Sequence, residues 1–131
     1  MEQKELLSLA LGQSAQISNY WTLYIAVTGT LIGVLTAEKL VLSSWVSRAV
    51  VTLLFAMFSY SNLVVGIVSA VQIRTAALSM VNEEQLGSLK TAGDGPPAWL
   101  YILFHLAFDL AVIIVVWYWP GRRRHPLRQA S

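Results

Sequence analysis

The sequence contains no cysteine, only four prolines and few charges: Asp, Glu, Lys and Arg make up 12% of its 131 residues. Without cysteine the chain can form neither a disulfide bond nor a thiolate metal site. A soluble domain typically has about a quarter of its residues charged. Together with a hydrophobic content of 56%, the shortage of charge predicts a membrane protein.

Sequence patterns typical of catalysis or of nucleic-acid binding are also missing. We find no glycine-rich phosphate loop, no metal-ligand spacing and no serine or cysteine nucleophile convincingly placed beside His105. The net charge of +2 gives no support to nucleic-acid binding, because four of the nine basic residues lie in the last ten positions. The sequence therefore predicts no enzyme, no cofactor and no metal site.

Three apolar stretches dominate the chain, at about 20–37, 49–73 and 98–119. Each has the roughly 20 residues that an α-helix needs to cross a bilayer core of about 30 Å. The pattern predicts an all-α, polytopic helical membrane protein with three transmembrane helices. Residues 1–131 would form a single integral membrane domain that ends in a basic tail, 120–131. Apolar residues at helical spacing in 2–17 predict an amphipathic or extended helical segment, which either lies at the interface or continues into the first crossing.

Basic residues predict how the chain is oriented. Lys39 and Arg48 in the first loop would lie on the same side as the arginines of the tail. Because cytoplasmic segments are enriched in Lys and Arg, we expect the amino terminus outside and the carboxyl terminus in the cytoplasm, in a cell (inner) membrane. Anionic lipid headgroups would contact Arg122, Arg123 and Arg124.

Aromatic residues near the ends of the apolar stretches agree with this orientation, because Trp and Tyr concentrate at membrane interfaces. Tyr20, Trp21 and Tyr24 begin the first crossing, and Trp99 and Tyr101 begin the third. Of these, Tyr20, Trp21, Trp99 and Tyr101 would mark the outer interface. The inner interface would be marked by Trp45, Trp117, Tyr118 and Trp119.

Polar residues fall inside the predicted crossings, and Asp109 is the most costly of them, at roughly 3 kcal/mol or more for a carboxylate at the bilayer centre. Its available partners are His105 one turn away, Asn62 or Ser59 across a helix interface, bound water or a cation, or its own proton. At about 100° per residue, small and polar residues form one stripe along the second crossing. Its members are Arg48, Thr52, Ser59, Asn62, Gly66 and Ser69.

Two further sets of small residues allow helices to approach closely. Gly29, Gly33 and Ala37 recur every fourth residue in the first crossing, and Gly66 and Ala70 are four apart in the second. They either pack the helices of one chain together or form contacts between chains. A single three-helix bundle is thin for enclosing both a polar stripe and a water path, which favours a homo-oligomer or a larger membrane complex.

These features suggest three functions. The first is a small homo-oligomeric membrane protein with a pore or channel-like role for ions or protons, in which Asp109, His105, Asn62 and Ser59 line the pathway or exchange protons. The second is a non-conducting accessory or assembly subunit of a larger membrane complex, where the same polar groups only join helices. The third, suggested by small size and hydrophobicity alone, is a membrane-disrupting effector.

Overall fold

The computed structural model describes residues 2–37, 42–82 and 95–118, of which 89% are helical and none lies in a strand. The first helix, α1 (Gln3–Thr36), is continuous through the predicted amino-terminal segment and the first apolar stretch. It begins with a capping box, in which Glu2 and Glu5 each bind the backbone nitrogen of the other. The amino-terminal segment therefore continues directly into the apolar stretch.

The second apolar stretch forms one long rod over Trp45–Ser79. It consists of α2 (Trp45–Tyr60), the π-helix η1 (Ser61–Val68) and α3 (Ser69–Ser79). Ser44 caps its start by accepting a hydrogen bond from the Ser47 nitrogen. The helix therefore begins a turn before the expected boundary at 49 and continues beyond 73.

The third apolar stretch forms α6 (Ala98–Tyr118) directly after Pro97, whose carbonyl accepts a hydrogen bond from the Leu100 nitrogen. At 1.5 Å per residue, its 21 residues extend about 32 Å. The predicted end at Trp119 lies outside the described residues. So do the first loop from 38 to 41, residues 83–94, and the tail with Arg122, Arg123 and Arg124.

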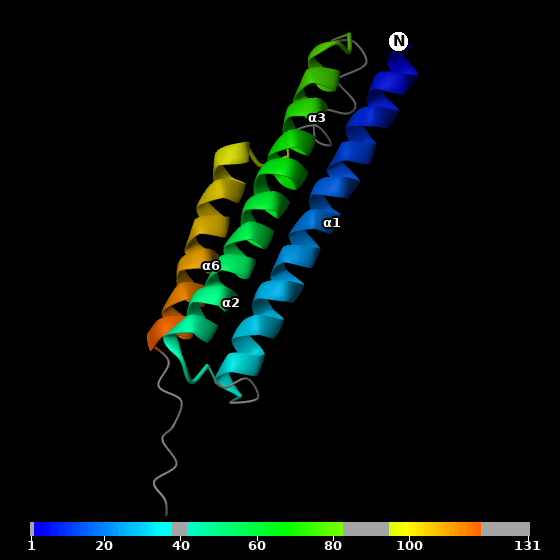
Figure 1. Cartoon of the computed structure of the whole chain (residues 1–131). Helices are drawn as coiled ribbons and strands as arrows, with labels where there is room; N and C mark the ends of the chain where they lie inside the picture. Colours follow the sequence, from blue (N-terminus) through cyan, green and yellow to red (C-terminus); the bar gives the residue numbers. More distant parts are fainter. Residues whose placement is uncertain (1, 38–41, 83–94, 119–131) are drawn as a thin grey trace, which may run out of the picture.

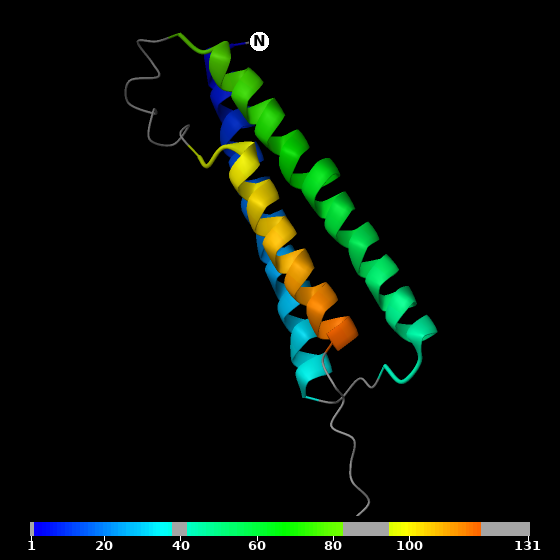
Figure 2. The ribbon, with the colours of Figure 1, turned by 90° about the vertical axis from the view of Figure 1, so that its left-hand side faces the viewer.

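The three rods lie side by side, with α2, η1 and α3 antiparallel to both α1 and α6 (Figures 1 and 2). The end of α1, the start of α2 and the end of α6 meet at one end of the bundle. At the other end, α1 and α3 continue together past the start of α6 (Figure 1). The two long rods therefore form a helical hairpin. Helix α6 covers only the part of this hairpin nearest to the end of α1 and the start of α2 (Figure 1).

Buried apolar residues divide along this bundle into three groups. One group, where all three rods meet, includes Tyr24, Phe55 and Val112. A second group joins α1 to η1 and α3 around Ile17, Ile67, Ala70 and Val71. The third lies in the two-helix extension, with Leu6, Ala10, Ala77 and Val81. The polar side chains described below lie between the first two groups.

Two of the helices are long and apolar enough to cross a membrane, Trp45–Ser79 and Ala98–Tyr118. Only 28% and 17% of their most apolar stretches is buried, whereas the core helix of a soluble protein would be mostly buried. Large side chains such as Leu53, Leu106 and Leu110 are exposed on them. A helical membrane protein is therefore consistent with the structure, and the first predicted crossing, 20–37 within α1, stays a prediction.

Candidate functional site

Asp109 lies in the middle of α6 and accepts hydrogen bonds from the other two rods. The Tyr24 hydroxyl of α1 is 2.8 Å from its Oδ1, and the Ser59 hydroxyl of α2 is 2.8 Å from both Oδ1 and Oδ2. Of the partners expected from the sequence, the structure brings Ser59 to the carboxyl group. Tyr24 is a partner that the sequence interpretation missed.

The carboxyl group is surrounded by neutral donors. Neither α1 beyond Lys4 nor α6 contains Lys or Arg, and the second rod has none between Arg48 and Arg74. Both of these arginines are several turns from Ser59. In a medium of low dielectric constant, a carboxylate with neutral partners alone is costly. This position therefore calls for a positive charge, either the carboxyl group's own proton or another cation.

Hydrogen atoms are scarce in this cluster. The Tyr24 hydroxyl has a second acceptor, the His105 carbonyl at 3.2 Å, in addition to Asp109. Tyr24 and Ser59 together supply two hydrogens for four oxygen–oxygen contacts. A proton on the carboxyl group would supply a third hydrogen for these contacts.

His105 is one turn before Asp109 and binds different partners. Its Nδ1 lies 3.2 Å from the Tyr101 carbonyl, and its Nε2 lies 3.2 Å from the Asn62 amide oxygen. The Asn62 amide nitrogen in turn donates to the Tyr20 carbonyl of α1 at 3.0 Å. A neutral imidazole has one N–H group, so both contacts are complete only when the ring carries two hydrogens. The site thus has a second place for a proton.

Tyr24 connects the two halves of this site. Its ring stacks on His105 with centroids 3.8 Å apart and planes inclined by 26°, while its hydroxyl binds Asp109. Both rings are fully buried. The sequence placed Tyr24 only near the beginning of the first crossing. In the structure it lies between α2 and α6 on the buried face of α1.

Ser59 and Asn62 lie on either side of the change from α2 to the π-helix. Ser59 is in the last turn of α2 and Asn62 is the second residue of η1. A π-helix has wider turns, and such segments frequently occur at functional sites. Of the two partners expected for Asp109 across a helix interface, Ser59 binds it, whereas Asn62 binds His105 one turn earlier on α6.

The predicted polar stripe of the second rod faces the other helices over most of its length. Near its start, the Arg48 Nη1 donates to the Trp117 carbonyl at 3.0 Å, and the Thr52 hydroxyl accepts from the Trp117 indole nitrogen at 3.1 Å. Gly66 is buried against Tyr20. Ser69 instead donates to the Val64 carbonyl of its own rod.

The two sets of small residues behave differently. A Cβ atom added to Gly66 would lie 2.8 Å from the Tyr20 ring, and Ala70 is buried beside Ile17 and Ile67. These two residues pack helices of one chain. Gly29 and Gly33, by contrast, have nothing within 4 Å of an added Cβ, and Ala37 is exposed. This second face of α1 packs against no other described helix.

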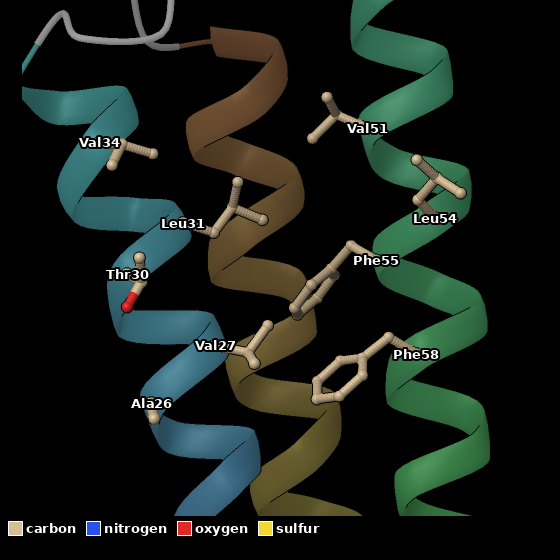
Figure 3. A pocket seen from close by; sticks show the side chains of 9 residues that line it. All are labelled: Ala26, Val27, Thr30, Leu31, Val34, Val51, Leu54, Phe55 and Phe58. Atoms are coloured by element: carbon tan, nitrogen blue, oxygen red, sulfur yellow. The ribbon is translucent and has the colours of Figure 1, made fainter.

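Beside this face, α1 and α2 diverge and leave an apolar groove of about 640 Å³ (Figure 3). Its one polar side chain is Thr30, and α6 runs behind the two rows of side chains (Figure 3). The residues lining it are Ala26, Val27, Thr30, Leu31, Val34, Val51, Leu54, Phe55 and Phe58. The groove is separate from the polar cluster, because Phe55 and Phe58 lie on its wall.

Comparisons with protein-family models, with curated proteins and with solved structures find no match for this chain. The class of this protein is therefore taken from its structure alone. It is an all-helical protein with two helices long and apolar enough to span a membrane. Its inner polar site consists of a carboxyl, a histidine, an amide and hydroxyl groups.

Proposed function

We propose that this chain is an integral membrane protein with three crossings that binds and passes ions or protons at Asp109. One observation carries the proposal: a carboxyl group halfway along a helix able to span the bilayer has, among the described residues, only neutral hydroxyl partners. Such a group requires a mobile positive charge to be stable there. Intramembrane ionisable groups commonly mark ion and proton pathways for this reason.

The arrangement around Asp109 supports binding by a single chain. Ser59, Asn62 and His105 are all buried between the rods of one chain, so enclosing these groups needs no second copy. Homo-oligomerisation therefore becomes a separate prediction from ion binding. Passage along the contact of α2 and η1 with α6 would use the hydroxyl and amide groups as successive partners for the ion.

Replacing Asp109 tests this function directly. We expect Asp109→Asn, in the full chain reconstituted into liposomes, to lower gradient-driven ion or proton flux at least about tenfold, equivalent to about 1.4 kcal/mol. The amide has nearly the shape of the carboxyl group but lacks its charge. Fluorescent dyes reporting internal pH and membrane potential would measure the flux.

Glu5→Gln is the matched control, because it makes the same chemical change at an exposed position at the far end of α1. The control should conduct like the unaltered chain. Gel filtration and circular dichroism would establish that Asp109→Asn remains folded. Equal flux in the two variants, or no flux in the unaltered chain, would exclude the conducting function.

An accessory or assembly subunit is the second candidate, favoured by the face of α1 with Gly29 and Gly33. Small residues on an unpacked face allow a helix from another chain to approach closely, and the groove of Figure 3 borders this face. Extraction in mild detergent separates the two candidates. A chain without flux that copurifies with a partner in fixed ratio supports the subunit.

A further inference from the structure

Among the described residues, Thr28 is the one buried polar side chain beside the site with no hydrogen-bond partner. It lies one turn after Tyr24 on α1, its side chain is 2% exposed, and its hydroxyl oxygen forms no hydrogen bond within the described part of the chain. The Thr28 hydroxyl lies close to the Tyr24 hydroxyl, but the two do not meet the geometry of a hydrogen bond. A buried hydroxyl without a partner is costly, so its position beside the Tyr24 hydroxyl, which itself binds Asp109, calls for a ligand.

From this we infer that the site takes a monovalent metal cation of the size of Na⁺, and that Thr28 is one of its ligands. The inference rests on the proposed function, since it names the ion that Asp109 would bind. The oxygens that would surround the cation come from all three rods. They belong to the Asp109 carboxylate, the Ser59, Tyr24 and Thr28 hydroxyls, and the His105 carbonyl.

Charge and ligand type select the class of ion. All of these groups present oxygen, which suits hard cations, whereas soft metals favour sulfur and imidazole ligands. The site has one carboxylate. The described residues contain no cluster of three or more His, Asp or Glu side chains that could hold a metal ion. One negative charge balances a monovalent cation, while a divalent ion would leave an excess positive charge in the membrane interior.

The spacing of the oxygens determines the ion's effect on the site. Present oxygen–oxygen contacts of 2.8 Å are hydrogen-bond distances. For cation–oxygen distances near those of Ca²⁺, about 2.3–2.6 Å, neighbouring oxygens must move apart by on the order of half an ångström. The Tyr24 hydrogen then remains bonded to the His105 carbonyl, already within 3.2 Å. Sodium and the compact hydrogen-bonded arrangement therefore exclude one another.

Thermal unfolding of the purified full chain in nanodiscs tests the inference. A ligand that binds only the folded state raises the Tm. We expect NaCl to raise the Tm above that in choline chloride of equal ionic strength. Thr28→Val keeps the shape and removes the hydroxyl, and should raise the apparent Kd for Na⁺ at least about tenfold. Retention of ²²Na⁺ would check the affinity independently.

Two variants make the result specific to the hydroxyl of Thr28. Thr28→Ser keeps the hydroxyl and should retain the response to Na⁺. Thr30→Val makes the same change at an exposed threonine two residues further along α1, on the side of the groove, and should leave the response unchanged. If the unaltered chain responds equally to both salts, or Thr28→Val binds Na⁺ as tightly as the unaltered chain, the sodium site is excluded.

Failure of this inference is distinguishable from failure of the proposed function. Proton flux that depends on Asp109, without any response to Na⁺, would remove the sodium site and keep the conducting function. Sodium binding that depends on Thr28, without flux, would keep the site and remove conduction.

Discussion

Tyr24 lies at the centre of the site, although a tyrosine near the end of a predicted crossing is typically found at the lipid headgroups. The spacing of the buried residues of α1 contains the missing signal. Ile17, Tyr24, Thr28 and Leu35 are separated by seven, four and seven residues, which places them on one helix face. Thr28 lies near the middle of the stretch 20–37, so a tyrosine one turn earlier on the same face belongs to the interior.

Asp109, His105, Ser59 and Asn62 could be selected from the sequence because polar groups in apolar helices are costly and seek partners. Their pairing could not be predicted. Aligning helices by the centres of their apolar stretches ignores tilt and unequal length, and either effect shifts a residue by a turn. Asn62 consequently meets His105 where Asp109 was expected. Hydropathy gives depth to within about one turn, and partner choice depends on smaller differences.

Gly66 provides a test at the scale of a single residue. We expect Gly66→Ala to destabilise the protein by about 1 kcal/mol, because the new Cβ would lie 2.8 Å from the base of the Tyr20 ring. Overpacking of this kind costs about 1–3 kcal/mol, while replacing a helical glycine by alanine contributes up to about 1 kcal/mol in the opposite direction. Denaturant unfolding in detergent, followed by circular dichroism, would measure the difference.

Gly29→Ala is the matched control for this variant. Nothing lies within 4 Å of an added Cβ there, so only the gain in helix propensity, up to about 1 kcal/mol, should remain. The two variants should therefore change the free energy of unfolding in opposite directions. A stabilising effect at both positions would contradict the packing of η1 against α1 at Tyr20.

At the scale of elements, the apolar stretches predict the helices but not their internal hydrogen-bond register. The π-helix η1 has no signature in hydropathy, because Ser61–Val68 is as apolar as an ordinary crossing. Packing constraints on both sides explain it. Ser59 must face Asp109 and Asn62 must face His105, while Gly66 and Ala70 must face α1. A wider turn allows the face of the rod to change between these contacts.

The two-helix extension explains why α1 and the second rod exceed the length of a crossing. At about 1.5 Å per residue, 34 residues extend about 51 Å, well beyond a bilayer core of about 30 Å. Leu6 and Ala10 pack against Ala77 and Val81 there, while exposed polar residues such as Lys4, Glu5 and Gln16 lie on the outside. The amino-terminal pattern predicted a helix, but its partner could not be read from the local sequence.

For the whole molecule, the number of crossings is the prediction on which orientation and function depend. The cysteine-free sequence allows single cysteines to report topology without background. We expect a membrane-impermeant maleimide, applied to intact cells, to label Ser8→Cys in the exposed surface of α1. Ser43→Cys in the first loop and Ser131→Cys at the carboxyl terminus should react only after permeabilisation.

Each pairwise comparison in this experiment tests a different helix. If Ser8→Cys and Ser43→Cys react on the same side, α1 does not cross and the Tyr24 hydroxyl reaches Asp109 from outside the bilayer. If Ser43→Cys and Ser131→Cys react on opposite sides, then either the second rod or α6 crosses the membrane, but not both. A complete exchange of sides would reverse the orientation while keeping three crossings. In that last case Asp109 would still lie midway, because its depth depends on α6 crossing and not on which end faces the cytoplasm.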